Sequence, residues 1–257
     1  VAALFAIMTK VGAYAIIRVY TMIFPPQLEA TSGLEDVWLM PAALVSLALG
    51  MIGILAAKSL DRLVAFSVIG SMGMVMVAIA LMTPDGIAAA LYYIVHSTLA
   101  GAALFLIVDL VKSSRPSLSL VAMSPVAGAS LTAGLFFAAA IAMAGLPPLS
   151  GFVGKLMILD ASFETPFGVW VWVIVLKASL ISLIGFARAG SIVFWKAESV
   201  PVVEDDEVFE RPHALSYCAV GGLIALLAAY TVFGGQAQSY MISTSQQLFA
   251  PDAYIKT

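Results

Sequence analysis

Four ionisable side chains lie deep inside long apolar stretches of this sequence, and they are the residues that could do chemistry. They are Lys10, His96, Lys155 and Lys177. A lysine at the centre of a membrane-spanning helix costs about 2.5–3.5 kcal/mol on insertion scales, so three together cost about 8–10 kcal/mol. That sum is comparable to the stability of a whole folded domain, so the presence of these groups needs a reason.

Proton transfer is the chemistry that these side chains indicate. An amine withdrawn from water loses its proton more readily, and a histidine titrates near neutral pH without help. Groups at similar depth on neighbouring helices could therefore pass protons through intervening water. The polar side chains that could support this relay are Thr9, Ser97, Thr98 and Ser150, with Ser179 and Ser182 as further positions that could hold water.

Two structural explanations of the charged residues compete with a proton relay. Snorkelling toward the membrane surface accounts for Arg18, Lys58 and Lys196, which lie nearer the ends of apolar stretches. It fits the three deep lysines poorly, because a side chain of about 6 Å cannot reach out from a centre about 15 Å deep. Ion pairing inside the bundle would need acids, and Asp109 and Asp160 are the only ones within the spans, near their ends.

The composition indicates an integral membrane protein. Apolar residues make up 62% of the 257 residues and charged residues only 11%, against about 45–50% and about 25% in soluble domains. Mean hydropathy is +1.05. The net charge of −3 offers no basic footprint for nucleic acid, and the single cysteine, Cys218, can form neither an internal disulfide nor a metal cluster. We therefore expect a protein of the lipid bilayer with no metal and no cofactor.

The apolar stretches predict the fold class. Helices long enough to cross a membrane are expected at about 2–24, 38–57, 64–83, 86–111, 126–163, 167–196 and 214–234. A transmembrane β-barrel would instead show short segments of alternating polarity. The predicted fold is all-α, a polytopic transmembrane helix bundle of about seven crossings. Its transmembrane domain covers residues 1–235, and an interfacial tail covers 236–257.

One of these stretches, 126–163, is too long for a single simple crossing. It contains Gly145, Pro147, Pro148 and Gly151 close together. The prolines remove two amide donors and the glycines permit a sharp turn. We expect one discontinuous crossing with an unwound centre, which survives in a membrane only when it is buried in protein or lines a watery cavity.

The charged loops predict the orientation of the chain. Basic residues gather in or beside the loops 58–63, 112–125 and 197–213, whereas the alternate loops carry acids and neither lysine nor arginine. Because cytoplasmic loops carry the excess of basic residues, the first set is expected in the cytoplasm and the C-terminus outside. This alternation holds only if 126–163 crosses the membrane once.

Four motifs, in this order along the chain, resemble those of antiporter-like membrane subunits. The run Met8–Val19 resembles their lysine-bearing helix, and Leu60–Ser67 with the glycines that follow resembles a second conserved stretch. Tyr92–Ser97 resembles their histidine helix, and Gly145–Lys155 resembles their broken helix. This family includes the proton-pumping membrane subunits of respiratory complex I and the subunits of Mrp-type multisubunit Na⁺/H⁺ antiporters. Three features are most similar to one Mrp branch, the D-type subunits. They are Thr9 beside Lys10, the end of the broken helix, and Phe186–Ser191.

The resemblance implies roles for the deep residues. It implies two inverted helical repeats, of which this chain would supply the second, C-terminal half and lack the N-terminal half. That expectation agrees with a first residue, Val1, that opens inside an apolar helix. Lys10 would link the two half-channels, and His96 and Lys155 would belong to the second relay, with Lys155 near its exit. Lys177 has no such support and is included on its expected burial alone.

The sequence departs from the family at one position. Members often carry a lysine five residues after the histidine, and that position is Gly101 here. The relay would then pass through His96, water or another helix. The glutamate that pairs with a channel lysine in the family would lie in the missing N-terminal part.

Three functions fit these observations. The first is a proton-translocating subunit of a multisubunit Na⁺/H⁺ antiporter in the plasma membrane, with other membrane subunits as partners; it would carry the proton path rather than a Na⁺ site. The second is a proton-pumping membrane subunit of complex I, in which electrons would be handled elsewhere. The third is a non-conducting membrane scaffold whose buried lysines only form structural pairs.

Overall fold

The structure is a computed structural model that describes residues 2–24, 33, 35–123, 126, 128–199 and 213–250. Over these residues it is helical and contains no strand, which confirms the all-α prediction. The helices are α1 (Ala2–Met22), α2 (Met40–Ala56), α3 (Leu60–Ala80), α4 (Pro84–Lys112), α5 (Ala129–Ala144), α6 (Ser150–Ser162), α7 (Gly168–Gly190), α8 (Ala214–Val232) and α9 (Gly234–Leu248). Short turns of π-helix, Glu35–Leu39 and Ser191–Trp195, extend α2 and α7, and a 3₁₀ turn, Lys196–Ser199, follows.

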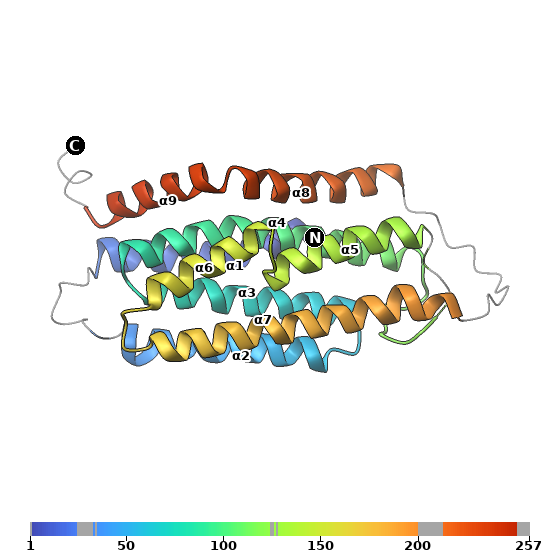
Figure 1. Cartoon of the computed structure of the whole chain (residues 1–257), viewed down its shortest axis with the longest axis horizontal. Coiled ribbons are helices and arrows are strands. Elements are labelled where there is room, and N and C mark those ends of the chain that lie inside the picture. Colours follow the sequence, from blue (N-terminus) through green and yellow to red (C-terminus); the bar gives the residue numbers. More distant parts are fainter. Residues whose placement is uncertain are drawn as a thin grey trace.

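The predicted crossings correspond to the observed helices one for one. Six of them correspond to the single helices α1, α2, α3, α4, α7 and α8, and the crossing at 126–163 corresponds to α5 and α6 together. Among the described residues, five helices are long and apolar enough to span a membrane by themselves: 37–56, 60–80, 84–112, 168–195 and 214–232. The discontinuous crossing is also observed, because α5 and α6 together run along the bundle with an interruption near its middle (Figure 1).

Some helix boundaries differ from the prediction, and α3 shows why. It begins at Leu60 rather than near 64, so its first turn contains the polar residues Asp61 and Arg62. An acid in the first turn is favourable because it faces the positive end of the helix dipole. Hydropathy alone places the start of such a helix too late.

Helix α4 is the central element of the bundle, and it carries His96. Thr83 caps its first turn, with its Oγ1 accepting a hydrogen bond of 3.0 Å from the amide of Gly86. Residues along most of its length are buried, including small ones such as Ala89, Ala100 and Ala103, which let neighbouring helices approach closely. Figure 1 shows α8 and α9 on one side of it and α2 and α7 on the other.

Glycines allow α2 and α3 to pack at close range. A Cβ atom added to Gly73 would lie 2.5 Å from the backbone nitrogen of Leu47, and one added to Gly50 would collide with the backbone of Gly70. Real Cβ atoms do not come so near to backbone, so only glycine fits these crossings. The glycines at 70 and 73 therefore allow these two helices to approach each other closely.

Two connections and the end of α7 meet at one end of the bundle and share hydrogen bonds. The amide of Leu60 donates to the carbonyl of Leu118 at 2.9 Å, and the amide of Leu120 donates to the carbonyl of Lys58 at 2.8 Å. Arg188, in the last turn of α7, donates to the carbonyl of Ala57 at 2.8 Å. The basic loops at 58–63 and 112–125 therefore lie at the same end as the end of α7, as a single pass of 126–163 requires. We call this set of contacts the basic-end clamp. Most of the loop 197–213 lies outside the described residues.

The segment expected as an interfacial tail is helical over most of its described length. Helix α9 follows α8 after a turn at Phe233 and lies against α4 along the same side of the bundle (Figure 1). The buried hydroxyl of Ser245 donates to the carbonyl of Pro84 at the start of α4. This part of the tail is therefore packed on the bundle, and residues 251–257 lie outside the described part of the chain.

Candidate functional site

The interruption between α5 and α6 is built by glycine and proline. Gly145 caps α5 in the left-handed conformation, with φ +74°, and its amide donates to the carbonyls of Ile141 and Ala142 at 3.1 Å. Pro147 and Pro148 follow and have no amide hydrogen to continue the helix. Helix α6 then starts at Ser150. The break leaves the last carbonyls of α5 without helical partners, so they can accept hydrogen bonds from side chains.

Lys155 fills the break from the α6 side. Its side chain is 6% exposed, and its Nζ donates to the carbonyl of Ala144, the last residue of α5. The same nitrogen donates to the hydroxyl of Ser179 on α7 at 2.9 Å, and that hydroxyl donates in turn to the carbonyl of Val175 at 3.0 Å. One ammonium group therefore connects the two half-helices with α7. No carboxylate among the described residues forms an ion pair with it.

His96 contacts the same break from α4. Its side chain has no exposed surface, and its Nδ1 lies 2.9 Å from the hydroxyl of Ser150, the first residue of α6. Its Nε2 is buried and has no hydrogen-bond partner among the described residues. The ring lies over Gly151, because a Cβ added there would be 2.7 Å from Nε2. The carbonyl of Ala142 also acts on this ring, so the imidazole lies among polar groups from both half-helices.

Lys10 reaches the interior from α1. Its side chain is 5% exposed, and its Nζ has no hydrogen-bond partner within the described residues. It lines a cavity of about 280 Å³ between α1 and α4, together with Ile7, Val11, Tyr14, Ile17, Leu91 and Ile94. Both Lys10 and Lys155 lie near enough to His96 to act on it electrostatically. The structure thus brings three of the four predicted groups into one neighbourhood.

The fourth group, Lys177, lies elsewhere. Its side chain is exposed on the outer surface of α7, so the expectation that it is buried within this chain is wrong. Ser179 faces the opposite side, because two residues along a helix are about 200° apart. Hydropathy identifies an apolar helix but does not show which of its faces packs inward.

Of the polar residues predicted to support the relay, some contact the buried groups and others do not. Ser150 contacts His96, as expected for a relay, but Thr9 is exposed. The hydroxyls of Ser97 and Thr98 both donate to the carbonyl of Ile94 in their own helix, at 3.2 and 2.8 Å. Hydroxyl groups bound to their own backbone in this way are common in helices and need no functional explanation.

The two groups that accept hydrogen bonds from Lys155 differ in how well the sequence predicts them. The carbonyl of Ala144 could have been found, because a helix that breaks before a Gly-Leu-Pro-Pro run must leave carbonyls unpaired nearby. Ser179 is one of several hydroxyls on apolar helices, and its direct contact with the lysine depends on how α7 rotates against α6. Ser182, one turn further along α7, is buried and its hydroxyl has no partner among the described residues.

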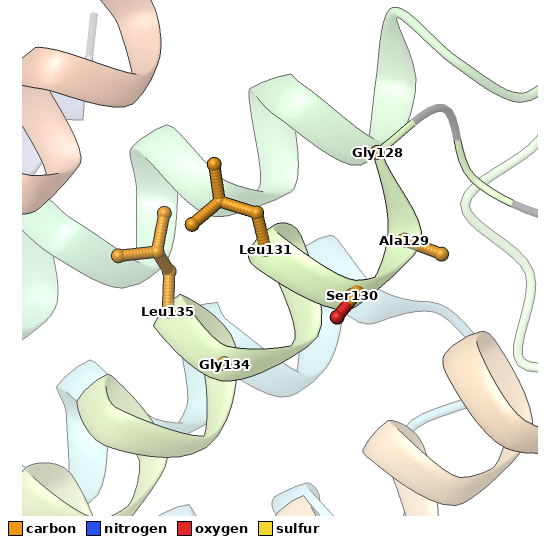
Figure 2. Close-up of a pocket in the computed structure, with 6 residues that line it drawn as sticks. All are labelled: Gly128, Ala129, Ser130, Leu131, Gly134 and Leu135. Carbon is orange, nitrogen blue, oxygen red and sulfur yellow. The ribbon is translucent and has the colours of Figure 1, made fainter.

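Two other pockets of the described structure are lined by no amine. One of about 650 Å³ lies along the start of α5, and Figure 2 shows Leu131 and Leu135 projecting from one side of that helix. Another of about 450 Å³ lies at the end of the bundle opposite the basic-end clamp and includes Asp85, Asp160 and Glu164. Among the described residues, no acid forms an ion pair with Lys10 or Lys155.

The fold and the site define a polytopic helical membrane protein with buried amines around a broken helix. The chain belongs to the NADH:quinone oxidoreductase/Mrp antiporter transmembrane family, which matches residues 1–182. The family resemblance of the four motifs is thereby confirmed, and the protein is an integral membrane protein.

Curated relatives that agree with this assignment include D-type subunits of cation/proton antiporters. The chain is 32% identical to a probable K⁺/H⁺ antiporter subunit of this type from Rhizobium meliloti (strain 1021), over 98% of this chain and 51% of that protein. It is 36% identical to the corresponding Na⁺/H⁺ antiporter subunit of Bacillus subtilis (strain 168), over 77% of this chain and 40% of that protein. The chain thus spans about half the length of the curated relatives it matches.

Two solved structures share the fold. A chain of the Mrp complex from Dietzia sp. DQ12-45-1b is similar with a TM-score of 0.78 and 22% identity, over 98% of this chain and 54% of that one. A chain of respiratory complex I from Thermus thermophilus with bound NADH is similar with a TM-score of 0.76 and 24% identity, over 95% of this chain and 51% of that one. The arrangement of helices is therefore common to both kinds of complex.

Proposed function

We propose that this chain carries a proton path of a multisubunit monovalent cation/proton antiporter. The observation that carries the proposal is the buried set formed by Lys10, His96 and Lys155 beside the broken helix, with no carboxylate among the described residues to neutralise the amines. Curated relatives are named as D-type subunits of Na⁺/H⁺ or K⁺/H⁺ antiporters, which supports this class. Since the chain spans about half of those proteins, we assign it one part of the path, working with other membrane subunits.

The geometry supports a stepwise mechanism. Lys155, when protonated, is held by the carbonyl of Ala144 and the hydroxyl of Ser179, and when neutral it keeps a lone pair that accepts a proton. His96 is fixed through Nδ1 by Ser150, which leaves Nε2 free to exchange a proton with water. Lys10 occupies the α1 side of the same neighbourhood and supplies the next acceptor. Movement of a cation in the opposite direction would be coupled through the protonation states of these groups.

A proton-pumping role in complex I remains the second candidate. It is favoured by the likeness of fold to the Thermus thermophilus complex. The relatives named as antiporter subunits favour the first candidate. A purely structural scaffold is disfavoured, because unpaired buried amines lower the stability of the fold and a scaffold would gain nothing from them.

We further propose an orientation in the plasma membrane. The basic-end clamp faces the cytoplasm, since basic loops remain on that side. The end with Asp85, Asp160 and Glu164 faces outward. In this orientation the C-terminal end of α9 would lie outside, because it is at the end of the bundle away from the end of α7 (Figure 1).

Transport by the complete complex tests the proposal. Inside-out membrane vesicles that contain all subunits would first be acidified inside. The quenching of a fluorescent amine reports this pH gradient. Addition of NaCl, or of KCl in a parallel sample, should restore the fluorescence, because cation entry drives proton exit. No response to either cation would exclude the antiporter assignment.

Replacing Lys10 with alanine should reduce this fluorescence recovery roughly 100-fold while the complex still assembles, because a group that takes part in proton transfer contributes about that much. Val11→Ala is the matched control, since Val11 lines the same cavity without a titratable group. Full transport by an assembled Lys10→Ala complex would favour the scaffold function.

A further inference from the structure

The outer face of α7 is apolar along its length except for one cation. Exposed residues recur every three or four positions along α7, as expected for one face of a helix. The exposed residues of the stripe are Val169, Val173, Leu176, Lys177, Leu180 and Ile184. We call this stripe the α7 outer face. Its composition suits contact with lipid at every position but Lys177.

Lys177 lies near the middle of α7, where a charge in a membrane-spanning helix is most costly. It is the only charged residue in the stretch 168–187, near the middle of that stretch. Among the described helices, the other charged side chains are buried or lie within two turns of a helix end. No described residue makes a hydrogen bond or ion pair with its ammonium group. The side chain is too short to reach either membrane surface from this depth.

We propose that the α7 outer face is covered, in the assembled complex, by a transmembrane helix of another subunit that presents a carboxylate opposite Lys177. A carboxylate is the group that both neutralises the ammonium and accepts its hydrogen bonds in the absence of water. An apolar helix or lipid chains would leave the charge unpaired. This proposal rests on the proposed function only in that the chain works within a multisubunit assembly.

A second copy of this chain does not fit the same surface. Two copies related by a two-fold axis through this face would place one Lys177 near the other. Two ammonium groups close together in a low-dielectric interface repel each other. The described surface of α7 provides no acid to offset that repulsion, so the partner must be a different sequence.

Site-specific photo-cross-linking in the complete complex tests this inference. A benzophenone amino acid placed at Leu180, one turn from Lys177 on the same face, should form an adduct with another membrane subunit on irradiation. Mass spectrometry should locate the adduct on a helix with an aspartate or glutamate within one turn. Lys177→Arg should keep the adduct, whereas Lys177→Glu should lower its yield about tenfold or more, because it replaces attraction with repulsion.

Lys177→Gln provides a second measurement in case charge reversal prevents insertion of the chain. It removes the charge without introducing an acid. In samples that have not been irradiated, it should weaken co-purification of the partner subunit under high-salt washing. The amount of this chain inserted in the membrane should stay unchanged. Adducts with lipid alone, adducts within this polypeptide, or yields that do not respond to either substitution would each overturn the proposal. The readout is a covalent adduct rather than transport, so its failure is distinguishable from failure of the antiporter assignment.

Discussion

Lys155→Met in the complete complex should lower cation-driven proton transport roughly 100-fold or more, with the complex still assembled. Methionine has similar length and shape but neither charge nor a proton to transfer, so the change isolates the chemistry of the amine. In the structure, the Nζ of this lysine contacts the carbonyl of Ala144 and the hydroxyl of Ser179 at the helix break. Fluorescence recovery in vesicles after addition of NaCl measures the effect.

Two companion variants define what the result means. Leu156→Ala changes the exposed neighbour of Lys155 and should retain transport. Lys155→Arg keeps a charged donor but cannot release its proton at physiological pH, so it should be about as inactive as Lys155→Met. Normal transport by Lys155→Arg would show that the amine has a structural role, and normal transport by Lys155→Met would remove it from the path.

Gly145→Ala should destabilise the complex and also impair transport. The residue has φ +74°, a conformation that costs an alanine about 1–2 kcal/mol. The added Cβ would also lie 2.7 Å from the Nζ of Lys155, so the ammonium would have to leave its position at the carbonyl of Ala144. The expected result is a lower temperature of half-aggregation for the purified complex and a reduced rate of transport at a temperature where it remains folded.

The matched control for Gly145→Ala is Gly134→Ala on the same half-helix, α5. A Cβ added to Gly134 would meet nothing within 4 Å of the described structure, and this residue is helical. Alanine favours a helix over glycine, so this variant should be as stable as the unchanged protein or slightly more so. If both variants behave alike, the geometry of the break does not hold Lys155 in place.

The fold could be predicted from the sequence because its signals are local. Apolar stretches of helical length give the crossings, and the glycines and prolines near 147 give the break, since each acts on the backbone where it stands. The single passage of 126–163 follows from where the basic loops fall along the chain. These signals do not depend on how one helix rotates against another.

The candidate site could be predicted only in part for the opposite reason. Lys10, His96 and Lys155 are indicated by the cost of a charge at depth, and the structure buries all three. The same argument applies to Lys177, yet that residue lies on the outer surface. The cost of a charge at depth indicates that the residue has a role, but it does not show on which face of its helix the residue lies. The contact of Ser179 with Lys155 likewise depends on tertiary packing.

The basic-end clamp has a practical consequence for engineering the protein. Surface loops commonly tolerate insertions, and a connection such as 113–123 would ordinarily be chosen for an epitope tag. Here the backbone of Leu118 and Leu120 is hydrogen-bonded to the chain at residues 58–60, and the neighbouring Ala57 carbonyl is held by Arg188. Extra residues there would loosen the junction of α2 and α3 and, through it, the end of α7. A tag is better placed where the backbone makes no such bonds.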